Sequence, residues 1–219
     1  MSKQLQFQKC RILLRSKSFE ESSSFYQAVG LCELAEGLFS DGSMEIELRD
    51  QIQNFPAIYI EPENDSDVYN HYTDLGIIFD CISTINGTTE LFFTDPNGLN
   101  IFLGEKTQPT AECLSTAKIA ELSHGSRHFA DSANFWVQLG AKCEATRSNY
   151  PRTLVQNGPL RLGIHDHKKK PGQGIIFNVE PKAITELKKL GFPLMKNTDG
   201  SYLTFSPEGV QCTIVAKYK

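Results

Sequence analysis

The chain has 219 residues, 40% of them hydrophobic, which is enough for one large core or two cores of roughly 100 residues each. Its formal net charge of -4 gives no positive field that would hold nucleic acid or an anionic membrane surface, and no segment approaches the roughly 18 apolar residues of a membrane span. The six cysteines form no CxxC or CxxxC pair, so we expect a cytoplasmic protein without a zinc knuckle.

The first half contains clear helix and strand signals. Ser18 and Glu21 form a capping box, which predicts a helix that begins there and ends at Gly30. Alternating apolar and polar residues over 44–49 predict a strand, and apolar spacing over 65–75 predicts a second helix. The sequence Asp-Pro-Asn-Gly at 95–98 is typical of a type I turn before a final strand.

The second half gives the same signals in the same order. A polar stretch with a proline, 106–115, reads as a linker, and AKIAEL at 117–122 reads as a strand. A helix carrying Phe129 and Trp136 should end at Gly140. Alternation over 160–165 predicts a strand, and Pro181 suits the first turn of another helix.

These matched signals form an internal repeat. Phe25-Tyr26 recurs as Phe135-Trp136 at an offset of 110, and Pro96-Asn97-Gly98 recurs as Pro207-Glu208-Gly209 at an offset of 111. Each half therefore reads as strand, helix and three strands, followed by the same series again. We predict an α+β protein with an N-terminal domain at 7–105, a linker at 106–115 and a C-terminal domain at 116–219.

The ordered set of strand, aromatic helix end with a glycine stop, and Asp-Pro-x-Gly strand entry resembles the vicinal oxygen chelate superfamily, which includes glyoxalases, bleomycin-resistance proteins and extradiol dioxygenases. The resemblance implies two tandem glyoxalase-like domains. In each domain, paired βαβββ modules would form an eight-stranded open cup with its helices outside. The cup would hold the ligand or the metal ion.

The resemblance also implies where metal ligands would lie. Members that use a metal ion supply a glutamate at the eighth residue of the pattern DPxGNxxE, and those positions here are Phe102 and Thr213. Counting back from the helices places the first-strand ligand positions at about Arg11 and near Lys118. None of these side chains is a typical ligand of a divalent metal.

The fifth-strand positions of the two halves fall near Phe55 and Gly174, which also supply no metal-binding side chain. We therefore expect no cofactor. A divalent metal ion bound in a different way stays open as an alternative.

In the first cup, strand alternation places Arg11, Glu45, Glu47 and Arg49 on the face away from the helices, with Phe102 on a neighbouring strand. One interpretation is a polar ligand site built from paired charges. The other is a solvated face of an open sheet.

In the second cup, the same alternation exposes Arg161, His165 and His167, with Lys118 and Thr213 opposite. Histidines two residues apart on a strand can bind one metal ion, and His165 could also serve as a general acid or base. The remaining interpretation is a solvated strand end.

The sequence is therefore interpreted as a glyoxalase-like protein that lacks the usual metal ligands and binds a small planar or cationic molecule. One alternative is a metal-dependent lyase or dioxygenase with a non-standard site around His165 and His167. Another is a structural pseudo-dimer. We expect a small-molecule ligand, no nucleic-acid or membrane partner, and either a monomer that acts as an internal pseudo-dimer or a homodimer.

Overall fold

The computed structural model describes residues 6–50, 56–63, 68–85, 88–104, 113–145 and 152–217. These residues form two eight-stranded sheets and four helices, with one sheet from each half of the sequence. The α+β arrangement of two tandem sheets is the one predicted from the internal repeat. No helix among these residues is both long enough and apolar enough to cross a membrane.

The first sheet has the strand order β2-β3-β4-β1-β5-β8-β7-β6, so that β1 and β5 lie at its centre. Strand β1 pairs in parallel with β4 and antiparallel with β5, and β5 pairs in parallel with β8. The elements of this half are β1 (Phe7–Arg15), α1 (Phe19–Val29), β2 (Cys32–Ala35), β3 (Leu38–Ser40), β4 (Glu45–Arg49), β5 (Ala57–Pro62), α2 (Val68–Asp74), β6 (Cys81–Ile85), β7 (Thr88–Thr94) and β8 (Asn100–Gly104).

The second sheet repeats this topology in the order β10-β11-β12-β9-β13-β16-β15-β14, with β9 and β13 at its centre. Strand β9 pairs in parallel with β12 and antiparallel with β13. The elements of this half are β9 (Lys118–Ser126), α3 (Phe129–Gln138), β10 (Lys142–Ala145), β11 (Arg152–Asn157), β12 (Leu160–Asp166), β13 (Gln173–Val179), α4 (Pro181–Lys189), β14 (Met195–Lys196), β15 (Tyr202–Phe205) and β16 (Gln211–Ala216).

Local signals in the sequence fix the helix ends. The Ser18 hydroxyl accepts a hydrogen bond from the Glu21 N–H and caps α1, and Gly30 ends α1 with a φ of 105°. A positive φ suits glycine because it has no Cβ to clash with the backbone. Pro181 opens α4 as its first residue, where a missing N–H costs nothing. The predicted start of α1 at Ser18 and the proline start of α4 are therefore confirmed, whereas the reciprocal half of the capping box is replaced: the Ser18 N–H donates to the Ser16 hydroxyl rather than to Glu21.

Strand alternation separates the two faces of each sheet. On the first sheet, Ile12, Ile46 and Ile58 belong to the main hydrophobic core, whereas Leu13 and Tyr59 form a small cluster on the opposite face. We call the face opposite the helices the first cup, and the corresponding face of the second sheet the second cup. Polar side chains gather on both.

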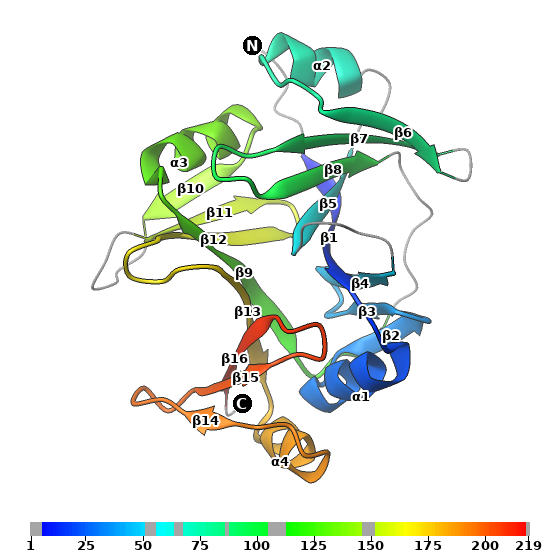
Figure 1. Cartoon of the computed structure of the whole chain (residues 1–219), viewed down its shortest axis with the longest axis vertical. Helices are drawn as coiled ribbons and strands as arrows, with labels where there is room; N and C mark the ends of the chain where they lie inside the picture. Colours follow the sequence, from blue (N-terminus) through cyan, green and yellow to red (C-terminus); the bar gives the residue numbers. More distant parts are fainter. Residues whose placement is uncertain are drawn as a thin grey trace.

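One hydrophobic core on the helix side extends through both halves. Helix α1 of the first half lies beside α4 of the second (Figure 1), and the ring of Phe25 on α1 packs on Phe192 with centroids 5.0 Å apart. The ring of Phe135 on α3 packs beside that of Phe93 on β7, with the ring centroids 6.2 Å apart. Each half thus covers part of the other half's helix layer, which fixes how the two cups sit relative to one another.

Candidate functional site

Three central strands of the first sheet place Arg11, Tyr59 and Phe102 side by side. Arg11 on β1 pairs with Tyr59 on β5, and Tyr59 pairs with Phe102 on β8. The predicted cup residues Arg11 and Phe102 are therefore brought together, with an aromatic ring between them. Phe55, the expected fifth-strand position, lies outside the described residues.

Arg11 is surrounded by carboxylates in the first cup. Its Nε lies 2.7 Å from Oε2 of Glu45, and its Nη1 lies 3.0 Å from Oε2 of Glu47. Its Nη2 lies 3.4 Å from Oε1 of Glu61, which also pairs with Lys9 at 3.8 Å. Burial alone would lower the pKa of Arg11, but the hydrogen bond to Glu45 and the nearby carboxylates raise it above its ordinary value. Arg11 is therefore a permanent cation in this cup.

A second arginine completes what we call the first polar cluster: Lys9, Arg11, Glu45, Glu47, Arg49, Glu61 and Glu90. The Nε of Arg49 lies 2.7 Å from Glu47 Oε1, and its Nη2 lies 3.3 Å from Glu90 Oε1. The predicted residues Glu45, Glu47 and Arg49 thus lie in one charge network with Arg11. Glu47 and Arg49 each keep 21% of their side-chain surface exposed, so this network is open to solvent at that end.

Aromatic rings line the other side of the cluster. The guanidinium carbons of Arg11 and Arg49 lie 5.1 and 5.6 Å from the ring centre of Tyr59, within cation–π range. Phe102 packs on Phe92 with centroids 5.0 Å apart. Burial and the charge of Glu61 raise the pKa of Tyr59 to about 12, so its phenol stays protonated. The first cup therefore combines flat apolar surface with fixed charge.

The corresponding three strands of the second sheet align Glu121, Ile176 and Thr213. This register corrects two of the positions at which the resemblance places metal ligands. The fifth-strand residue beside Thr213 is Ile176, because Gly174 pairs with Gln211. The first-strand residue of the same row is Glu121, three residues beyond Lys118. Thr213 is half-buried in the aligned row.

Sequence reasoning missed Glu121 because it allowed for a loop insertion before the helix. The offset of 110 between the two aromatic pairs leads directly from Arg11 to Glu121. The repeat itself therefore contained the signal.

Glu121 forms a second polar cluster with Arg152, His165 and Lys170. The His165 Nε2 lies 3.1 Å from Glu121 Oε1, and Arg152 pairs with Oε2 of the same carboxylate. Burial opposes the charge on Glu121, yet the hydrogen bond from His165 and the charge of Arg152 hold its pKa below the ordinary value. Burial lowers the pKa of Lys170. A carboxylate bonded to an imidazole can hold or move a proton.

The other predicted residues of the second cup lie elsewhere. His167 follows the end of β12, where its N–H donates to the Ser126 carbonyl. Lys118 donates to the carbonyl of Asp41, and Arg161 pairs with the Asp41 carboxylate at 3.5 Å. Both cations therefore join the second half to the β3–β4 turn of the first.

Two rows of paired residues cross the central strands, one in each cup: Arg11, Tyr59 and Phe102 in the first, and Glu121, Ile176 and Thr213 in the second. The side chains of these rows do not suit a divalent metal ion. The first row offers a guanidinium and two aromatic rings, and the second offers one carboxylate that is already paired with Arg152. Among the residues that the structure describes, no group of three or more His, Cys, Asp or Glu side chains could hold a metal ion. We therefore derive no chemical step through a metal ion.

Comparisons with known proteins identify the fold. No family model and no curated protein matches the sequence. The Mn(II)-bound glyoxalase from Novosphingobium aromaticivorans is 15% identical, with a TM-score of 0.67 over 98% of this chain and 84% of that one.

Two dioxygenase structures are similar over the same extent. A catechol 2,3-dioxygenase is 11% identical with a TM-score of 0.68, and the alignment covers 98% of this chain and 89% of that one. The 2,3-dioxygenase LapB from Pseudomonas sp. KL28 is also 11% identical with a TM-score of 0.68, over 99% and 94% of the two chains. The chain therefore has the fold of these glyoxalase and dioxygenase structures, with one eight-stranded sheet from each half.

Proposed function

We propose that this protein binds a small planar molecule with a positive charge in the first cup, without a metal ion. The observation that carries the proposal is the central row of Arg11, Tyr59 and Phe102. Aromatic rings offer flat surface for stacking, and this row continues into the packed pair of Phe102 and Phe92.

The charge balance of the first polar cluster supports a cationic ligand. The cluster holds four carboxylates and three cations, so one negative charge is in excess at neutral pH. Glu47 lies at the more exposed end of the cluster, where a ligand can reach it from solvent. A cation that lies over an aromatic face and beside a partly buried carboxylate is stabilised by a cation–π interaction and by an ion pair.

The ion pairs of Arg11 with Glu45 and Glu61 support binding without a metal ion. Glu45 and Glu61 are almost fully buried and each is paired with Arg11, so binding a divalent ion would require those pairs to break. Removing one partner from a buried pair leaves an uncompensated charge, which is strongly unfavourable. Mn(II) and Zn(II) should therefore show no stoichiometric binding by calorimetry.

A fluorescence titration with proflavine, a planar cation, tests the proposal. We expect saturable binding to the native protein and a higher melting temperature in its presence. Phe102→Ala removes a stacking surface and should weaken proflavine binding at least tenfold, or about 1.4 kcal/mol.

The matched control is Thr213→Ala, because Thr213 occupies the equivalent position on β16. It should leave proflavine affinity unchanged. Equal affinity of Phe102→Ala and the unmodified protein, or tight binding of a metal ion that Glu47→Gln abolishes, would contradict the proposal.

A further inference from the structure

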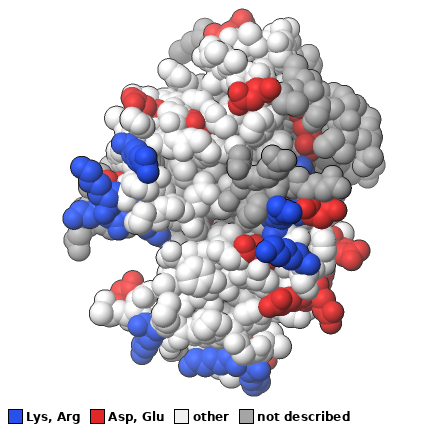
Figure 2. Space-filling model, in the orientation of Figure 1, with Lys and Arg blue, Asp and Glu red and all other residues white. Residues whose placement is uncertain are grey.

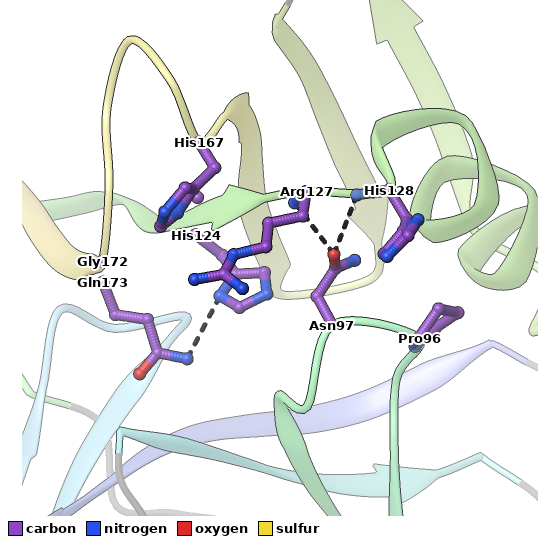
Figure 3. Close-up of a pocket in the computed structure, with 9 residues that line it drawn as sticks. Pro96, Asn97, His124, Arg127, His128, His167, Gly172 and Gln173 are labelled. Carbon is purple, nitrogen blue, oxygen red and sulfur yellow. Dashed lines mark hydrogen bonds between the residues drawn. The ribbon is translucent and has the colours of Figure 1, made fainter.

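A cavity lies between the two halves, outside both cups. It is a pocket of about 470 Å³, and it is lined on one side by the β7–β8 turn and on the other by the end of β9 and the β12–β13 loop (Figure 3). We call it the inter-half pocket. Its polar lining residues are Asn97, His124, Arg127, His128, His167 and Gln173.

The β7–β8 turn is anchored to the start of α3 at this pocket. Oδ1 of Asn97 accepts hydrogen bonds from the N–H groups of Arg127 at 3.0 Å and His128 at 3.1 Å. The Asn97 amide also contacts Ser132 on α3. These contacts fix the backbone that carries Arg127 and His128, so both side chains extend from a rigid base.

The residues that line the pocket include one fixed cation, Arg127, and no carboxylate. Within the described part of the chain, no carboxylate forms an ion pair with Arg127, whose side chain reaches from the β9–α3 junction toward the loop that carries His167 (Figure 3). Two carboxylates pair with lining histidines: Asp131 lies 4.0 Å from His128, and Asp95 lies 3.9 Å from His124.

The surrounding surface extends this positive character. Figure 2 shows Lys and Arg side chains along the edge of the molecule over the β12–β13 loop, whereas Asp and Glu side chains gather over α1 on the opposite side. The loop contains the run Lys168-Lys169-Lys170 immediately after His167. A positive field around a pocket attracts anions and raises their local concentration.

His124 is polar where the repeat predicts an apolar residue. The offset of 110 pairs it with Leu14, which is fully buried in the core, and His124 itself is only 4% exposed. Gln173 donates to its Nδ1 at 3.1 Å, so the ring proton lies on Nε2. Among the described residues Nε2 makes no hydrogen bond, and it faces the buried Asp95 carboxylate at 3.9 Å. His124 therefore places a polar donor whose hydrogen bonding is incomplete in the lining of the pocket.

We propose that the inter-half pocket binds a small molecule through its phosphate or carboxylate group, with Arg127 as the main contact and His167 and His128 beside it. A guanidinium presents two parallel N–H donors that match an oxyanion in a bidentate way. The pocket volume exceeds that of a single oxyanion and falls within the range of small-molecule sites.

Isothermal titration calorimetry of the full chain tests this site, with inorganic phosphate in one arm and acetate in the other, at constant ionic strength. We expect saturable binding in at least one arm, and the tighter arm identifies the oxyanion. Arg127→Gln should weaken that binding at least tenfold, and His167→Gln should weaken it less, because an imidazole cannot present the two parallel N–H donors of a guanidinium to one oxyanion.

The matched control is Lys17→Gln, since Lys17 stands at the position equivalent to Arg127 in the first half. It removes one positive charge from the same repeat position and should leave anion affinity unchanged. Melting curves in sodium chloride show whether each variant is folded. No saturable binding in either arm, or equal affinity of Arg127→Gln and Lys17→Gln, would overturn the proposal. Proflavine binding in the first cup is a separate readout, so either proposal can fail alone.

Discussion

The side chain of Glu121 depends on the absence of a side chain at Gly163. A methyl group at Gly163 would lie 2.5 Å from Glu121 Oε1 and 2.6 Å from its Cδ, so the carboxylate occupies the space that glycine leaves. From there it reaches both His165 and Arg152. The whole second polar cluster is therefore organised around one buried carboxylate.

Replacing that carboxylate should make stability depend on pH in a defined way. Because the folded protein holds the pKa of Glu121 below its unfolded value, ionised Glu121 contributes stability above about pH 4.5, and this is lost as pH falls through the folded pKa. We expect Glu121→Gln to lower the free energy of unfolding by about 2 kcal/mol at pH 7.

Urea unfolding of both proteins between pH 3 and pH 7 measures this difference. It should shrink toward pH 3, where a protonated glutamate resembles glutamine. A difference that stays constant across the range would show that the charge on Glu121 does not stabilise the fold.

At the scale of elements, the repeated Asp-Pro-x-Gly-type turn has a role that its sequence does not reveal. Each turn docks on the helix of the other half. Asn97 of the first turn accepts hydrogen bonds from the Arg127 and His128 N–H groups just before α3, and Glu208 of the second accepts hydrogen bonds from Ser22 and Tyr26 on α1, the latter at 2.8 Å. The turns therefore hold the two halves together as well as opening a strand.

Loss of the Asn97 contact should loosen the start of α3. Asn97→Ala leaves the N–H groups of Arg127 and His128 without their acceptor, which should cost about 1 kcal/mol. Hydrogen exchange of those two amides should accelerate. Asn197→Ala is the control, because its side chain bonds only to Ser201 within a hairpin among the described contacts. Equal exchange rates of these two amides in the Asn97 and Asn197 variants would show that Asn97 does not protect them.

The sequence predicted the elements well because their signals are local. A capping serine, a proline at a helix start and strand alternation act within a few residues. It placed the site less well. Strand β9 contains a register shift between Ile119 and Glu121, and Lys118 and Arg161 turn toward Asp41 of the other half. Contacts between distant segments decide where those side chains point, and no local pattern encodes them.

At the scale of the whole molecule, the two halves contact each other in matching ways. The Asp41 carboxylate accepts a hydrogen bond from the Ile119 N–H at the start of β9, and Asn157 Oδ1 accepts one from the Phe7 N–H at the start of β1. Reciprocal contacts of this kind are typical of two-fold symmetric dimers. The two halves thus contact each other reciprocally and share one core.

A shared core predicts a single unfolding transition. Trp136 is the only tryptophan and reports on the second half, whereas Ile46 is fully buried in the first. Ile46→Ala should lower the free energy of unfolding by about 3 kcal/mol and shift the Trp136 fluorescence transition together with the circular dichroism transition. Ile78→Ala, at an 84% exposed position, should shift neither. A Trp136 transition that stays in place in Ile46→Ala would mean that the halves unfold separately.

The two turn contacts differ in how much chain they enclose. Asn97 and Arg127 are 30 residues apart, but Ser22 and Glu208 are 186 apart. The entropy of closing a loop grows with the logarithm of its length, so the second contact costs about 1.6 kcal/mol more to form from an open chain. This difference favours an order of assembly in which the middle of the chain associates first. We therefore expect the contact between α1 and the last turn to form after the contact between the β7–β8 turn and the start of α3.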